Sequence, residues 1–235
     1  MPDAADTAGP PWPRPEIPHQ LNPVHPVFFV SHATAYDPEL DVRGTEPNAL
    51  FSEFYRDLSQ DLNQLVARRA GADPGFIDRG LRAGAGWEPE ILNAIGTCQV
   101  LVALVSGPFA GSEWCGKEWY AFTSRRTWRR SDNTLMDRPF CALPVLWTVG
   151  PQNDYPQIVM KQQQFKPRPS TTMQLDRIYL REGIYGMYMV EPAAYRASVW
   201  RLAQEIKKLV TEYWVEPLIP TDNRTLINVF AEEET

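Results

Sequence analysis

The sequence predicts a single doubly wound α/β domain built on a sheet of about five parallel strands. Short apolar segments of strand length alternate with helical patterns along the chain. This alternation is typical of a parallel sheet that carries helices on both faces, with right-handed crossovers. The run 100–105 is continuously apolar, as expected of a strand buried on both faces. A length of 235 residues, 43% of them hydrophobic and 22% charged, is enough to bury the core of one such domain.

The composition excludes several classes of protein. A net charge of -6 argues against direct binding of nucleic acid by broad neutralisation of phosphates. No apolar run approaches the roughly 20 residues that span a bilayer, and no secretory signal opens the chain. We therefore expect neither a membrane nor a nucleic acid among the partners.

The cysteines and histidines predict a reducing compartment and no metal. The cysteines are few, odd in number and without a Cys-x-x-Cys pair, which is typical of a cytoplasmic protein with free thiols: Cys98, Cys115 and Cys141. The histidines lack the spacing of metal ligands, and two of them fall in a proline-rich segment: His19, His25 and His32.

The first half of the chain begins with a proline-rich segment. Residues 1–26 hold eight prolines, so we expect a flexible arm. A first strand over 27–33 precedes a loop and a helix over about 48–70, whose apolar residues recur at helical spacing. A short strand over 75–78 precedes a glycine-bearing loop, 79–87, and a helix to about residue 98.

The second half contains the most regular pattern. The strand 100–106 is followed by a helix that Ser112 can cap and that we expect to extend to about Arg130. A strand over 140–147 comes next, then irregular chain over 148–176 with one short helix. Residues 183–190 fit either a fifth strand or a helical turn. A last helix begins at Pro192, so the predicted domain covers 27–215 and a tail covers 216–235.

The motifs of several common α/β activities are missing. Gly-x-Gly-x-x-Gly does not follow the first strand, and the chain contains neither a P-loop nor a Gly-x-Ser-x-Gly elbow. The loop 79–87 has the glycines of a phosphate cradle, but Glu88 and Glu90 open the next helix and would repel an anion there. A mobile flap, with Trp87 as its apolar tip, fits that loop better.

The stretch after the central strand carries the candidate chemistry. In Ser112-Glu-Trp-Cys-Gly-Lys-Glu118, Trp114 and Glu118 are four residues apart and share a helix face. This face lies just past the carboxyl end of a central strand, where open α/β sheets bind ligands. The alternative for Glu118 is a solvated carboxylate or half of an ion pair. Trp114 fits a pocket or the core, and Cys115 fits a pocket lining or a small buried apolar side chain.

The order of these features resembles a Toll/interleukin-1 receptor (TIR) domain, which has a flavodoxin-like fold. The resemblance covers residues 27–147 and rests on Phe28-Phe-Val-Ser-His32, Asp78 with the loop to Trp87, the strand to Ser106, and Trp-Cys-x-x-Glu118. The last motif is similar to enzymatic bacterial and plant members, and other stretches are similar to TIR-like proteins of actinobacteria. The chain lacks the Arg-Asp-x-x-Pro-Gly string of many animal members, which speaks against receptor-type signalling.

The resemblance implies an NAD+ nucleosidase with Glu118 as its catalytic residue. Such enzymes release nicotinamide and either ADP-ribose or a cyclic isomer, often in bacterial anti-phage defence, and they self-associate through TIR–TIR contacts. NAD+ is then the substrate, and no further cofactor is expected. One carboxylate can suffice because nicotinamide leaves without acid catalysis and an anion stabilises the ribosyl cation.

Other residues are candidates for substrate contacts. Trp114 can stack on the cationic nicotinamide ring, with Cys115 lining the pocket. Ser31 and His32 end the first strand at the same sheet edge and are placed to touch ribose or adenine. Arg79 and Trp87 contact substrate or only border the flap. The alternative function is a non-catalytic TIR-like module that binds a partner protein, as in peptide maturation, through the 79–87 loop.

Overall fold

The computed structural model describes residues 15–34, 49–67, 72–78, 87–151, 154–167 and 173–231. Its centre is a parallel sheet with the strand order β2-β1-β3-β6. These strands are β1 (Phe28–Ser31), β2 (Gly75–Ile77), β3 (Val100–Val105) and β6 (Ala142–Leu146). The order is compatible with a flavodoxin-like fold, so the α/β class and the parallel sheet are confirmed. The prediction of about five strands in the parallel sheet is wrong for the described residues, because four of their strands belong to this sheet.

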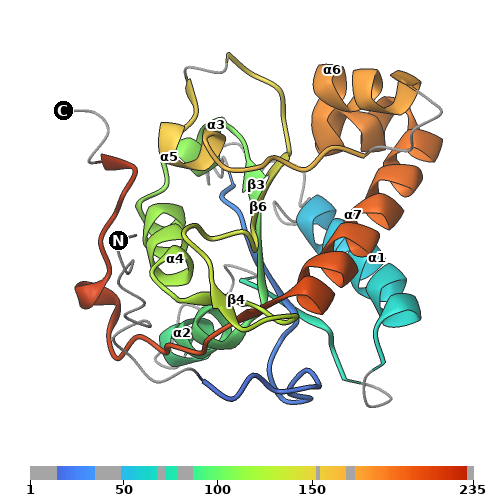
Figure 1. Ribbon diagram of the computed structural model, residues 1–235. Helices are drawn as coiled ribbons and strands as arrows, with labels where there is room; N and C mark the ends of the chain where they lie inside the picture. The colour runs from blue at the N-terminus through green and yellow to red at the C-terminus, as the bar shows by residue number, and fades with distance from the viewer. Residues whose placement is uncertain are drawn as a thin grey trace, which may run out of the picture.

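Helices cover both faces of this sheet (Figure 1). On one side α1 (Ala49–Leu65) packs against α7 (Pro192–Glu212), and α6 (Met173–Val190) packs on α7. On the other side lie α2 (Trp87–Thr97) and α4 (Glu113–Thr123), which contact each other. The short helices are α3 (Gly107–Ala110) and α5 (Gln157–Met160). The sheet is therefore the middle of three layers.

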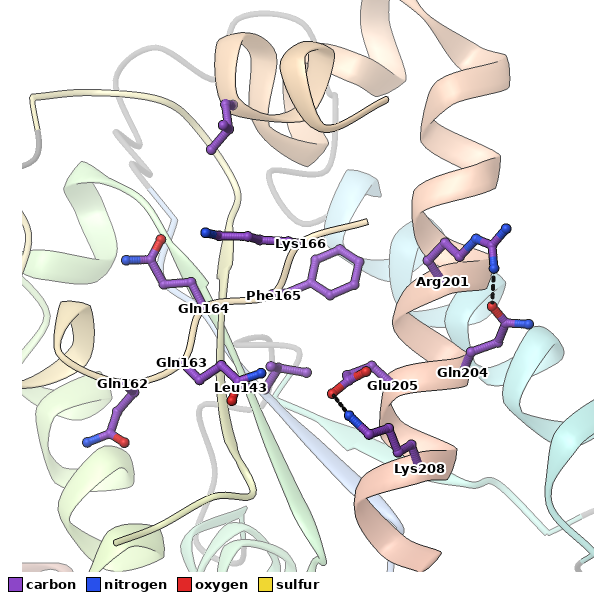
Figure 2. Close-up of a pocket in the computed structure, with 11 residues that line it drawn as sticks. Leu143, Gln162, Gln163, Gln164, Phe165, Lys166, Arg201, Gln204, Glu205 and Lys208 are labelled. Atoms are coloured by element: carbon purple, nitrogen blue, oxygen red, sulfur yellow. Dashed lines mark hydrogen bonds and ion pairs between the residues drawn. The ribbon is translucent and has the colours of Figure 1, made fainter. Parts of the chain in front are cut away.

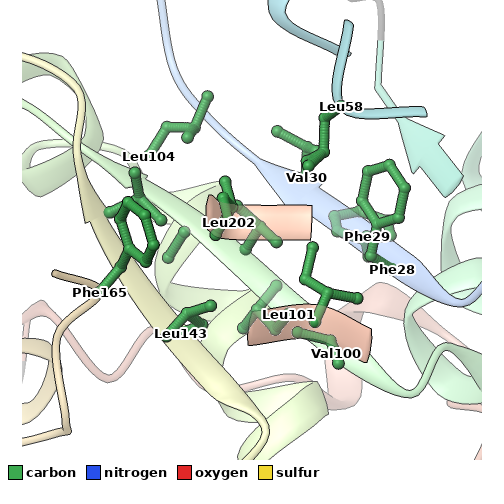
Figure 3. Packing of buried hydrophobic residues seen from close by; sticks show 14 of the residues in the cluster. Phe28, Phe29, Val30, Leu58, Val100, Leu101, Leu104, Leu143, Phe165 and Leu202 are labelled. Carbon is green, nitrogen blue, oxygen red and sulfur yellow. The ribbon is translucent and has the colours of Figure 1, made fainter. Parts of the chain in front are cut away.

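The core is built around β3, whose six residues are all buried. Figure 3 shows apolar side chains from β1, β3 and β6 meeting those of Leu58 on α1 and Leu202 on α7. Burial of each large apolar side chain contributes about 1.5–3 kcal/mol, so this layer supplies much of the driving force for folding. The continuous apolar run in the sequence is explained by burial on both faces of the sheet.

Residues 183–190 form the second part of α6 rather than a strand. Ile184 and Met187 are fully buried, whereas Tyr185 is 40% exposed, which is a helical and not a two-residue periodicity. Gly183 interrupts the helix with φ 63° and ψ -179°. A Cβ at this glycine would stand 2.6 Å from the carbonyl oxygen of Trp147, so the kink requires glycine for two separate reasons.

The helix predicted to run to about Arg130 ends at Thr123. The chain then forms β4 (Thr127–Arg129), which pairs antiparallel with β5 (Thr134–Leu135) and β7 (Tyr213–Val215). Trp128 lies opposite Trp214 in this second, three-stranded sheet. Pairing with a strand from the end of the domain therefore overrides the local helical pattern.

The segments that flank the domain are partly described. Residues 15–26 of the predicted arm have no helix or strand, and the Pro18 carbonyl accepts a hydrogen bond of 2.6 Å from Arg130. The tail contains a 3₁₀ turn, η2 (Asn223–Thr225), and then crosses α3 and α4. There the Phe230 and Phe109 rings lie 5.3 Å apart, and a Cβ on Gly116 of α4 would collide with Asn228. No helix in the described ranges has both the length and the apolar character needed to cross a membrane.

Candidate functional site

Two serines fix the direction in which the chain leaves the central strand. Ser106 follows β3, and its hydroxyl accepts a hydrogen bond of 3.2 Å from the backbone N–H of Phe109 at the start of α3. Ser112 caps α4 in the same way by accepting from Cys115 N–H at 3.2 Å, as the sequence predicted. These caps anchor the first turn of α4, the helix that carries Glu118.

The Glu118 side chain points into the protein and not toward water. Glu118 is only 3% exposed, and the Ser31 hydroxyl at the end of β1 donates a hydrogen bond of 2.5 Å to its Oε2 atom. The half-buried Trp114 lies one turn earlier on the same face of α4, and its side chain favours the ionised form of this carboxyl group. The carboxyl end of a central strand and one face of α4 therefore meet at this group, as we expected from the sequence.

The two structural alternatives for Glu118 do not hold. The side chain is buried, so it is not a solvated helix carboxylate. Among the described residues it takes part in no ion pair. The adjacent cation, Lys117, pairs with Glu113 at 2.6 Å instead. A buried carboxyl group whose hydrogen-bond donor is a neutral hydroxyl is unusual, which makes Glu118 a candidate functional group.

Burial is the main cause that raises the pKa of Glu118, which reaches about 8. The nearby negative charge of Asp78 raises it further, whereas the hydrogen bond from Ser31 and the neighbouring Trp114 side chain favour the ionised form and lower it. At neutral pH the carboxyl group is therefore largely protonated but can be ionised by a small change in its surroundings. A cation placed beside it would be one such change.

Asp78 belongs to this cluster, although we did not single it out as a site residue from the sequence. It directly follows β2, the neighbour of β1 in the sheet, and its charge acts on both Glu118 and Cys115. The signal was present, because polar residues that follow adjacent parallel strands meet at one edge of the sheet.

Cys115 lies in the same cluster but is not poised as a nucleophile. It is fully buried, and burial followed by the charge of Glu118 raises the pKa of its thiol to about 12. Hydrogen bonds with Ser112 and Ser31 lower it only in part. A neutral thiol at physiological pH is a weak nucleophile, so Cys115 serves to fill space beside Glu118.

His32 points away from this cluster because successive residues of an extended chain face opposite sides. Ser31 turns toward α4, whereas the His32 ring packs 4.3 Å from the Phe51 ring on α1. Phe51 in turn stacks on Trp147 at 4.5 Å. We had expected both residues to reach one substrate from the same edge, but the structure places them on different faces of the sheet.

Of the two candidate residues in the 79–87 loop, Arg79 and Trp87, the structure describes only the backbone of Trp87. Arg79 lies outside the described residues, as does most of the 79–87 loop. Trp87 is the first residue of α2, so the backbone at the end of the loop is already helical there. Within the described ranges, no group of three or more His, Cys, Asp or Glu side chains could hold a metal ion.

Comparison with known proteins identifies no relative of this chain. No family model, no curated protein and no solved structure matches the chain.

Proposed function

We propose that this chain is a TIR-type NAD+ nucleosidase in which Glu118 stabilises the reacting ribose. The supporting observation is a buried carboxyl group that accepts a hydrogen bond from Ser31, with Trp114 on the same helix face, at the carboxyl end of a parallel sheet. Ligands of open α/β sheets bind at that edge, and buried groups with a strongly shifted pKa gather at functional sites. The sequence motif around Glu118 points to the same reaction.

The proposed reaction cleaves the bond between the nicotinamide nitrogen and C1′ of ribose. The bonding electron pair moves to the ring nitrogen and neutralises its positive charge, so the leaving group needs no proton. An ionised Glu118 stabilises the cation that develops on the ribose. Water then attacks C1′ and releases a proton to give ADP-ribose, or an atom of the same molecule attacks to give a cyclic isomer.

The raised pKa of Glu118 fits this reaction through the charge of its substrate. Without a ligand the carboxyl group is largely protonated at pH 7, because its pKa is about 8. The positive pyridinium ring of NAD+ favours the ionised form when it is bound nearby. The substrate would therefore generate the anion that the transition state needs, and a neutral nucleotide analogue would not.

The decisive experiment measures nicotinamide release from NAD+ by the purified full chain. Glu118→Gln keeps the shape and the hydrogen-bond acceptor but cannot ionise, so we expect the rate to fall by on the order of 10³-fold. Glu113→Gln on the same helix is the matched control, because Glu113 is exposed and pairs only with Lys117. Equal rates for wild type and Glu118→Gln would exclude Glu118 as the catalyst.

Assembly belongs to the same proposal, since TIR-type enzymes close their sites by self-association. The assay is therefore run over a range of protein concentrations, and we expect specific activity to increase with concentration. A cytoplasmic role in defence against phage, by loss of NAD+ or by a nucleotide signal, is the proposed biological setting. Absence of nicotinamide release even at high protein concentration would overturn the enzymatic proposal.

A second candidate is a non-catalytic module that binds a partner protein. The observation in its favour is the set of exposed apolar side chains on α6, where Leu180, Met189 and Val190 are 53%, 58% and 61% exposed. Met189 and Val190 are adjacent at the end of α6, and an apolar patch there would suit a partner protein. Partner capture that survives Glu118→Gln but is lost on Met189→Asp would support this function.

A further inference from the structure

A second recess lies away from Glu118, between α7 and the chain that follows α5. Its volume is about 950 Å³, and its wall shares no residue with the Glu118 cluster. Figure 2 shows Lys166 and the glutamine run 162–164 on one side and the Arg201–Lys208 face of α7 on the other. A recess of this size is large enough for a small organic ligand.

Positive charge gathers around this recess although the chain as a whole has a net charge of -6. Lys166, Arg201 and Lys208 contribute three cations to its wall, and Glu205 contributes the one carboxylate. Glu205 pairs with Lys208 at 3.3 Å, whereas no ion pair or hydrogen bond within the described part of the chain involves the Lys166 ammonium group. The wall therefore has an excess of positive charge that suits an anion.

The α7 residues reach the recess because of their spacing. Positions 201, 204, 205 and 208 each have a neighbour three or four residues away in this set and so form one stripe along the helix. Arg201 uses one of its five N–H donors on Gln204 Oε1, at 3.0 Å, and four remain for a ligand. Local pairs of this kind preposition the side chains without exhausting their donors.

The opposite wall offers neutral hydrogen-bonding groups above an apolar floor. The side chains of Gln162 and Gln163 each carry a donor and an acceptor, a combination that matches the edge of a nucleobase. Gln164 offers its acceptor, because its Nε2 atom donates to the Met160 carbonyl at 3.4 Å. Buried Leu143 and Phe165 lie beneath them. The Phe165 N–H donates to the Pro144 carbonyl of β6 at 2.9 Å, which fastens this segment to the edge of the sheet.

We propose that this recess binds a small phosphate-bearing molecule of the nucleotide class. Lys166, Lys208 and Arg201 contact the phosphates. The glutamine side chains form hydrogen bonds with the base or sugar of the ligand. This site is separate from the proposed catalytic centre, so it adds a second ligand and does not depend on cleavage of NAD+.

The test is calorimetric titration of the full chain with ADP, adenosine and inorganic pyrophosphate. We expect ADP to bind most tightly and adenosine to bind at least tenfold more weakly, because it lacks phosphates. The double variant Lys166→Gln/Lys208→Gln should weaken ADP binding by at least tenfold. The matched control is Lys161→Gln/Lys207→Gln, which removes the same charge from exposed positions nearby that do not line the recess.

Other outcomes would overturn the proposal. Equal affinity for ADP and adenosine would show that the phosphates are not recognised, and absence of ADP binding would show that the recess is not a nucleotide site. Because ADP is also part of NAD+, the titration is repeated with Ser31→Ala, which changes only the Glu118 cluster. Loss of ADP binding in Ser31→Ala, with binding retained in Lys166→Gln/Lys208→Gln, would place the nucleotide at the other site. Tighter binding of a short oligonucleotide than of ADP would assign the recess to nucleic acid.

Discussion

Two buried ionisable groups, Glu118 and Arg125, lie seven positions apart in the chain, and they are held in different ways. Arg125, just after α4, is 4% exposed and donates to three backbone carbonyls: Ile95 at 2.8 Å, Glu216 at 3.1 Å and Val215 at 3.4 Å. Glu118 is 3% exposed and accepts a hydrogen bond from the Ser31 side chain. The partners of Arg125 are three backbone carbonyls and the Cys98 sulfur, whereas the hydrogen-bond donor to Glu118 is the Ser31 side chain at a sheet edge.

The difference indicates which of the two groups is structural. The guanidinium ties the last turn of α2 to the chain at the end of β7, and a cation is favourable near a helix carboxyl end. Burial is the main cause that lowers the pKa of Arg125, but an arginine remains protonated in a protein. Glu118, with a pKa of about 8, changes its protonation in the physiological range. Arg125 therefore holds the fold, and Glu118 is free to respond to a ligand.

The largest expected effect is the loss of stability on Arg125→Met. Methionine fills a similar volume but leaves the buried carbonyls of Ile95 and Glu216 without this donor, so we expect a loss of about 3–5 kcal/mol in the free energy of unfolding. The measurement is urea unfolding followed by tryptophan fluorescence. Arg126→Met is the control, because Arg126 is exposed and its ion pair with Glu216 should contribute less than about 1 kcal/mol. Equal losses in the two variants would contradict the structural role.

The next effect concerns the pH dependence of stability, and here the variant Glu118→Gln is expected to gain stability rather than lose it. The pKa of Glu118 is raised from 4.5 to about 8 on folding, so the folded state binds the proton more tightly than the unfolded state. The contribution of Glu118 to the wild-type free energy of unfolding should therefore be highest below pH 4.5 and should decrease as the pH rises to about 8. Glu118→Gln has no such proton and should be more stable than wild type at pH 9, by roughly 2–4 kcal/mol.

Urea unfolding between pH 4.5 and pH 9 measures this difference. Glu113→Gln is again the matched control, because Glu113 is exposed, and its curve should follow that of the wild type. If the difference in stability between Glu118→Gln and wild type were the same at every pH, the buried carboxyl group would not titrate as the structure indicates.

A smaller effect is expected from removal of the Ser31 hydrogen bond, which separates its influence on the pKa of Glu118 from that of burial. Ser31→Ala removes the 2.5 Å hydrogen bond that favours the ionised carboxylate, so the pKa of Glu118 should rise above its wild-type value of about 8. We expect a shift on the order of one pH unit, equivalent to about 1.4 kcal/mol. Carbon-13 NMR of the labelled glutamate carboxyl group measures it without reference to activity. Ser106→Ala, at the end of the neighbouring strand β3, should leave the titration unchanged, and a shift there of the same size would contradict the assignment.

The comparison also separates what the sequence could predict from what it could not. The spacing of Trp114 and Glu118 predicted a shared face, and Ser112 predicted the start of α4, because both depend on neighbours in the chain. The partner of Glu118 is 87 residues away, so only the parallel sheet suggested that Ser31 would be near it. The end of α4 was missed because β4 forms through pairing with β7, and Arg125 was missed because its acceptors come from distant segments.

The smallest effect is expected for Cys115, which lies in the Glu118 cluster without serving its chemistry. The pKa of the thiol is about 12, so almost none of it is ionised at pH 7, and the side chain is fully buried. Cys115→Ala should therefore change nicotinamide release by less than about threefold and should cost about 1–2 kcal/mol of stability through the lost volume. Mass spectrometry after iodoacetamide treatment of the folded chain should find Cys115 unmodified, with the urea-unfolded chain as the labelling control. Rapid alkylation of the folded protein, together with loss of activity, would identify Cys115 as a reactive group and would make Glu118 the base that activates it.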